Sequence, residues 1–136
     1  MTEHLDTIVN ARLQGKEGLY RLGMSKGRFT EITVQQESVV ATDHNFDALG
    51  NLVTPAFVEP HIHLDAALTA GEPRWNQSGT LFEGIECWSE RKALLTENDV
   101  INRAIKTLKM FAAQGIQYVR THIDVTDPKL TALKAM

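Results

Sequence analysis

The clearest pattern of apolar and polar positions lies between residues 96 and 115. Apolar residues recur there at intervals of three and four, as on one face of a helix. They are Ile101, Ala104, Ile105, Leu108, Phe111 and Ala112. Thr96 stands at an N-cap position with Asp99 three residues later, and Gly115 stands where helices commonly end. The pattern predicts a helix over 97–114 whose apolar stripe belongs to a hydrophobic core.

Segments 54–65 and 116–125 flank this region and alternate between two faces, as strands do. In the first segment one face carries Phe57, Glu59, His61, His63 and Asp65, and the other carries Ala56, Val58, Ile62 and Leu64. In the second, the polar face includes Arg120, His122 and Asp124. Strand, helix and parallel strand form a βαβ crossover, so we expect the two strands to be neighbours. Glu59 and Arg120 are then expected to pair.

The connection between the first strand and the helix is predicted to contain a loop and a further helix. Residues 66–79 are rich in the glycine, proline and short polar residues typical of loops. Thr80 and Glu83 form a capping-box pattern, which predicts a helix from there to about Leu94. Asp127 and Pro128 are typical of the N-cap and first residue of another helix.

The N-terminal part, residues 1–53, is predicted to be all-β, and residues 54–136 to form a second domain. Strands are expected over 7–13, 18–24 and 28–34, with a tight turn at 25–27. Phe29, Ile32 and Val34 are expected to be buried. A short strand is expected at 39–41, a loop over 43–50, and Leu52 and Val53 lead into the next strand.

Composition restricts the functional class. The chain has 136 residues, is 43% hydrophobic and 23% charged, and has a net charge of −3, which is typical of a soluble globular protein. Without a basic cluster it offers no groove for nucleic acid. The sequence has no apolar run long enough for a membrane span, and its first residues lack the apolar region of a signal peptide, so we expect neither feature. The single cysteine, Cys87, excludes an intramolecular disulfide, so we expect a cytoplasmic protein.

His61 and His63 carry the most specific chemistry in the sequence. Two imidazoles on one face of one strand can bind a common ion at about 2.1 Å from each ring. Pro60 restricts ordinary strand pairing just before them, and Asp65 adds an acid on the same face. A metal-binding pair and a pair of structural histidines both fit the residues, and the pattern favours the metal.

Three segments resemble the amidohydrolase superfamily, and within it the bacterial cytosine deaminases. They are residues 57–65, which look like the end of a first barrel strand, residues 76–86 and residues 119–125. The resemblance implies an α/β fold. Half of a small β-sandwich would be followed by the first β-α-β unit of a TIM-like (β/α)8 barrel. Because such a barrel takes about 250 residues, we expect a truncated, N-terminal portion.

The resemblance also implies a reaction, in which a metal-bound hydroxide attacks cytosine and releases uracil and ammonia. His61 and His63 would be two ligands of a divalent ion, iron or zinc. The remaining ligands and the proton-handling carboxylate would lie outside this chain. No catalytic residue is therefore assigned within it, and the chain alone is expected to be inactive. The partner would be a small nucleobase, and the full-length protein could form a homo-oligomer.

Four further residues are assigned less specific roles. His122, Asp124 and Asp65 are candidates for orienting a ligand imidazole, although an internal polar network would explain His122 and Asp124 equally well. Leu81 would line the base-binding cavity by resemblance, or belong to the core. Two alternatives to a cytosine deaminase stay open. One is a related enzyme for isocytosine, an amino-triazine or a cyclic guanidine, and the other is a non-catalytic β/α remnant.

Overall fold

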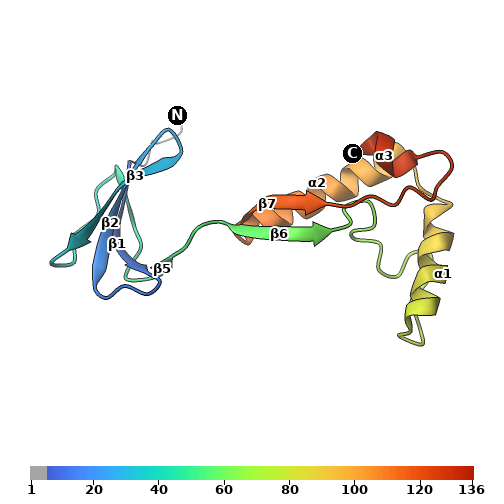
Figure 1. Cartoon of the computed structure of the whole chain (residues 1–136), viewed down its shortest axis with the longest axis horizontal. Coiled ribbons are helices and arrows are strands. Elements are labelled where there is room, and N and C mark those ends of the chain that lie inside the picture. Colours follow the sequence, from blue (N-terminus) through green and yellow to red (C-terminus); the bar gives the residue numbers. More distant parts are fainter. Residues whose placement is uncertain (1–5) are drawn as a thin grey trace. The chain divides into compact units, whose positions relative to one another are not determined.

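The computed structural model describes residues 6–136, which divide into two compact units with the boundary between Pro55 and Ala56 (Figure 1). The first unit contains strands only, and the second contains two strands and three helices. Within the described residues no helix is long and apolar enough to cross a membrane. The predicted order, an all-β part followed by mixed α/β structure, is confirmed.

The first unit is a five-stranded sheet. Its strands are β1 (Thr7–Leu13), β2 (Leu19–Ser25), β3 (Arg28–Gln35), β4 (Asn45–Asp47) and β5 (Leu52–Val53). The order is β3-β2-β1-β4, with β5 also pairing with β1. The three strands predicted over residues 7–34 are therefore confirmed. A small core is formed by Ala11 of β1, Leu22 of β2 and Ala48.

Three predictions for the first unit are wrong. Residues 39–41 form no strand, because the Asn10 side chain forms hydrogen bonds with both the backbone N–H and the backbone carbonyl of Val39. It accepts from the Val39 N–H at 2.9 Å and donates to the Val39 carbonyl at 2.7 Å. Strand β4 forms instead within the predicted loop and pairs in parallel with β1. The predicted buried set is exposed, at 53% for Phe29 and 60% for Val34, because β3 is an edge strand with an uncovered face.

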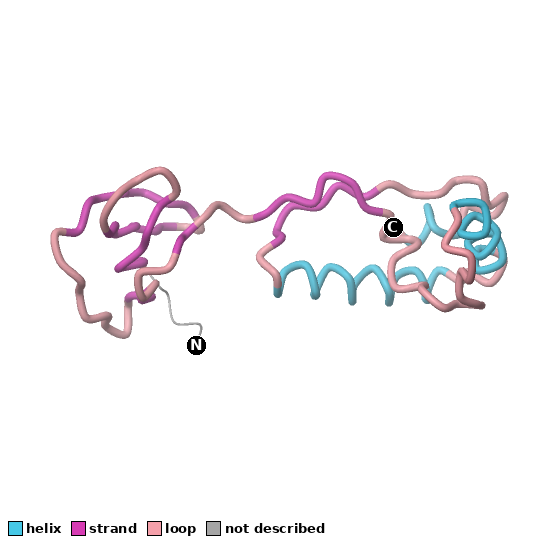
Figure 2. Tube along the Cα trace, turned by 90° about the horizontal axis from the view of Figure 1, so that it is seen from below, coloured by secondary structure: helices cyan, strands magenta, loops and turns pink. Residues whose placement is uncertain are grey.

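The second unit is built around a pair of parallel strands, β6 (Phe57–Ile62) and β7 (Ile116–Thr121). Between them in sequence come α1 (Leu81–Lys92) and α2 (Glu97–Ala113), and α3 (Thr131–Ala135) follows β7. Helix α2 runs alongside the strand pair (Figure 2). The predicted neighbouring position of the two strands and the β-α-β connection are confirmed.

Helix α2 has the predicted caps but only part of the predicted core face. The Thr96 hydroxyl accepts from the Asp99 N–H at 3.2 Å, and Gly115 adopts a φ of 80° after the last turn. The buried positions are Val100, Ala104 and Thr107, whereas Ile105 is 46% exposed. The other described residues therefore cover only part of the apolar stripe of α2.

The chain after β7 also differs from the prediction. The strand ends at Thr121 and not at residue 125. The Asp124 carboxylate accepts from the backbone N–H of Thr126, two residues later, at 2.7 Å. This hydrogen bond forms a local turn, which competes with strand pairing. Asp127 likewise accepts from the backbone of Lys129. Helix α3 therefore begins only at Thr131, after a turn.

Candidate functional site

Three histidines meet at the carboxyl ends of β6 and β7. His61 lies near the end of β6, His63 just beyond it, and His122 just beyond β7. The ring centroids of His61 and His63 are 5.7 Å apart, and those of His61 and His122 are 4.1 Å apart. The His122 N–H donates to the Ile62 carbonyl at 2.7 Å, which fixes His122 beside the pair. Sequence reasoning anticipated the pair but not the ring contact with His122.

Asp65 is the most buried polar group of this site, with an exposed fraction of 0%. Its Oδ2 accepts from the backbone N–H of Asp124 at 2.8 Å. Its Oδ1 has no hydrogen-bond partner in the part of the chain that the structure describes and lies 3.5 Å from Nδ1 of His63. A buried carboxylate is costly unless it has charged or donor partners, so His63 is the natural partner of Oδ1.

This geometry fits a metal-ligating imidazole. In metalloproteins one ring nitrogen of the histidine binds the ion and the other commonly donates to a carboxylate. A proton on His63 Nδ1 would face Asp65 and leave Nε2 free, while His63 itself is 48% exposed. Among residues 6–136 no group of three or more histidine, cysteine, aspartate or glutamate side chains forms a complete ion site.

Asp124 connects the strand ends to helix α1. Its Oδ2 accepts from Trp88 Nε1 at 2.7 Å and from Lys92 Nζ at 3.1 Å. Its Oδ1 accepts from the Thr126 N–H and hydroxyl, and Lys92 also contacts that hydroxyl. Desolvation raises the pKa of Asp124, but the hydrogen bonds from Thr126, Trp88 and Lys92 outweigh it and leave the pKa below its usual value.

The electrostatic surroundings of His122 favour its neutral form. Desolvation lowers the pKa of His122, and the nearby His61, Arg120 and His63 lower it further. A neutral imidazole keeps one nitrogen lone pair available as a hydrogen-bond acceptor or a ligand.

The predicted pairing of Glu59 and Arg120 is wrong. The Glu59 carboxylate accepts from the backbone N–H of His61 at 3.0 Å, and Arg120 is exposed. In the strand register Glu59 stands opposite Val119. With one group bound locally and the other in solvent, neither needs the other as a counter-charge.

Leu81 is the first residue of α1 and is 75% exposed. The interpretation of Leu81 as a core residue is therefore wrong for this structure. Its place in a base-binding cavity stays a prediction.

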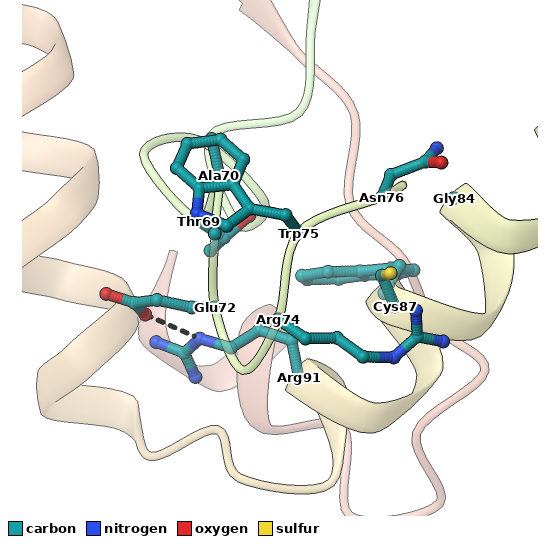
Figure 3. A pocket seen from close by; sticks show the side chains of 11 residues that line it. Thr69, Ala70, Glu72, Arg74, Trp75, Asn76, Gly84, Cys87 and Arg91 are labelled. Carbon is teal, nitrogen blue, oxygen red and sulfur yellow. Dashed lines mark hydrogen bonds and ion pairs between the residues drawn. The ribbon is translucent and has the colours of Figure 1, made fainter. Parts of the chain in front are cut away.

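Two cavities adjoin α1. One of about 490 Å³ is lined by His63, Ala66, Trp88, Asp124 and Thr126, so it opens beside the candidate ligand. The other, of about 260 Å³, lies between the loop after β6 and α1, where Glu72 pairs with Arg91 (Figure 3). Trp88 and Lys92 were not predicted as site residues, although their i, i+4 spacing on one helix face was a usable signal.

Residues 45–136 match the amidohydrolase family. The chain belongs to this family. The chain is 32% identical over 130 residues to N-isopropylammelide isopropyl amidohydrolase of Pseudomonas sp. strain ADP, and the match covers 92% of this chain and 32% of that protein.

Two crystal structures of 5-methylcytosine deaminase from Klebsiella pneumoniae also match this chain, one with 5-fluorocytosine and one with phosphonocytosine bound. Both are 55% identical with a TM-score of 0.89. The matches cover 95% of this chain and 31% and 32% of those chains. The chain thus spans about a third of the length of these relatives.

Proposed function

We propose that this chain forms the N-terminal third of a metal-dependent deaminase of cytosine or a ring-substituted cytosine. The observation that carries the proposal is the buried Asp65 carboxylate at Nδ1 of His63, beside His61, at the ends of two parallel strands. The 55% identity to a 5-methylcytosine deaminase supports the substrate class. In that reading β6 and β7 are the first two strands of a (β/α)8 barrel, whose sites lie at this end.

The residues of this chain would have distinct tasks. His61 and His63 would hold a divalent ion, iron or zinc, through imidazole nitrogens. When bound, the ion would acidify a water molecule and so provide a nucleophile at neutral pH. Asp65 would keep the His63 proton on Nδ1, and neutral His122 would border the site without adding a positive charge that repels the ion.

The same residues limit what the chain does alone. Two imidazoles leave most of the coordination sphere to water, whereas catalytic zinc sites typically have three protein ligands. No carboxylate of the described residues is assigned to proton transfer with the substrate. We therefore expect the chain alone to bind metal weakly and to be inactive. Its cytoplasmic location and its self-association stay predictions.

A chimera tests the proposal. The matching first third of the Klebsiella 5-methylcytosine deaminase would be replaced by this chain, and ammonia release from cytosine and 5-methylcytosine would be followed. We expect an active, metal-containing chimera, and loss of both metal and activity in its His61→Ala and His63→Ala variants. A folded, metal-loaded chimera that deaminates neither ring, or histidine variants that keep full metal content and activity, would refute the proposal.

A second candidate function follows from the other relative. The 32% identity to an enzyme named for N-isopropylammelide favours an amino-substituted ring other than cytosine. The same chimera, offered N-isopropylammelide, distinguishes the two, because activity on that compound alone would favour the second candidate.

A further inference from the structure

We propose that Trp88 and Lys92 of helix α1 are positioning residues for the candidate ligand His63, acting through Asp124 and Asp65. The inference rests on the proposed function, since it assigns His63 a role in holding an ion. It adds that the helix between the two strands sets the orientation of that ligand.

The first step is the attachment of Asp124 to α1. Trp88 and Lys92 are one helical turn apart and both donate to the same carboxylate oxygen, at 2.7 and 3.1 Å. The side chains of Lys92 and Asp124 are only 20% and 18% exposed, so water competes little with these bonds. Hydrogen bonds to charged groups are shorter and stronger than neutral ones. The segment that follows β7 is thereby held against α1.

The second step passes through the backbone of Asp124. Its N–H donates to Asp65 Oδ2 at 2.8 Å, which is the only hydrogen bond that this buried carboxylate makes with residues 6–136. The other oxygen faces His63 Nδ1. A displacement of the Asp124 backbone would therefore rotate the Asp65 carboxylate and change its distance to His63.

The third step concerns what this arrangement does for His63. That side chain is half exposed and projects beyond the last residue of β6, so strand pairing does not fix its ring. Asp65 is the acceptor that would favour the tautomer with Nε2 free for an ion. In this arrangement α1 holds Asp124, the Asp124 backbone holds Asp65, and Asp65 orients His63.

The test uses the full chain with Trp88→Phe, Lys92→Met and the double variant. Trp88→Phe keeps an aromatic ring but removes the donor, and Lys92→Arg serves as the conservative variant. Matched controls are Trp75→Phe and Lys109→Met, at two exposed positions. Circular dichroism melts would verify that each variant folds. If Trp88→Phe does not fold, the inference is tested with Lys92→Met alone.

Two readouts separate positioning from general stability. Nitrogen-15 NMR of the metal-free chain reports which nitrogen of His63 carries the proton, and a competition titration with a chromogenic chelator gives the Zn²⁺ affinity. We expect both single variants to shift His63 away from the Nδ1–H form. Zn²⁺ binding should weaken about 3- to 10-fold in each, below the range typical of direct ligand partners. Lys92→Arg and both controls should leave both readouts unchanged.

The inference is overturned if folded variants keep the wild-type tautomer and Zn²⁺ affinity, or if the controls change them equally. Failure of the proposed function looks different. In that case the wild-type chain binds no Zn²⁺ that depends on His61 and His63, while the metal-free NMR measurement still decides whether α1 controls His63.

Discussion

Asp65→Asn should separate metal affinity from folding stability. The substitution preserves shape but replaces one carboxylate oxygen by an N–H₂ group. If the amide oxygen keeps the Asp124 N–H, found at 2.8 Å from Oδ2, the new donor faces His63 Nδ1. His63 must then accept at Nδ1 and carry its proton on Nε2, the nitrogen needed for an ion. The opposite amide orientation places two N–H donors against each other at Asp124.

We expect the substitution to weaken metal binding and to leave the folding stability of the metal-free chain unchanged or slightly higher. Loss of a partner that orients a ligand histidine typically lowers metal affinity 10- to 100-fold, which corresponds to about 1.4–2.7 kcal/mol. The free energy of unfolding of the metal-free chain should stay the same or rise by about 1 kcal/mol. Asp65 is 0% exposed and has an oxygen without a hydrogen-bond partner, and removing an incompletely paired buried charge relieves its desolvation cost.

The assay combines a Zn²⁺ competition titration with urea unfolding of the metal-free chain. Asp43→Asn, at an exposed position of the first unit, is the matched control and should change neither quantity. If Asp65→Asn binds Zn²⁺ as tightly as the wild type, Asp65 does not set the state of His63. If it instead lowers the free energy of unfolding by several kcal/mol without metal, the carboxylate is structural and the reasoning fails.

Three further predictions concern stability. Hydrogen bonds from the Ser78 side chain and backbone, and from the Gln77 backbone, lower the pKa of Glu83 to about 2 from 4.5; because this pKa is depressed, its stabilisation is complete above pH 4.5 and lost as the pH falls toward 2. The melting temperature should therefore fall less steeply over that interval in Glu83→Gln, and equal slopes would contradict the assignment. Val100→Ala removes two methyl groups at a site with 0% exposure and should cost about 1.5–3 kcal/mol in urea unfolding, whereas a cost below about 0.5 kcal/mol would mean that α2 is not packed as described. Arg91→Met should cost about 1–3 kcal/mol in the same assay, less than a fully buried pair, since its partners Asp99 and Glu72 are 28% and 56% exposed; a larger loss would indicate that both carboxylates are desolvated in solution.

Helix ends were predictable because their signals are local. Thr80 and Thr96 both accept from the backbone N–H three residues later, and Gly115 ends α2 with a positive φ. The capping box at Thr80 is only half formed, however. The Glu83 carboxylate reaches back to the Ser78 N–H at 2.6 Å and not to that of Thr80, because the loop before α1 offers closer donors.

Burial was less predictable, since it depends on what lies opposite an apolar face. Alternation correctly placed Phe29 and Ile32 in a strand, but both are more than half exposed. On α2 the buried line runs through Val100 and Thr107, while the apolar Leu108 is 39% exposed. An apolar pattern identifies a face that is able to pack in a core. It does not show which element packs against that face, and burial depends on that element.

The placement of His122 shows why the site was predictable only in part. Strand alternation alone places His61 and His63 on one face, and this alternation can be predicted directly from the sequence. His122 depends on the register between β6 and β7. Glu59 stands opposite Val119, but Ile62 stands opposite Thr121, so three steps along β6 match two along β7. An extra residue of this kind is a bulge, and it includes Pro60, which has no N–H to pair. Strict alternation across both strands assumed no such shift. This shift cancels an opposite one between Phe57 and Val58, so Phe57 opposite Ile116 and Ile62 opposite Thr121 have the same offset. The departure from strict alternation is confined to the residues between them, and there it accounts for the missing Glu59–Arg120 pair.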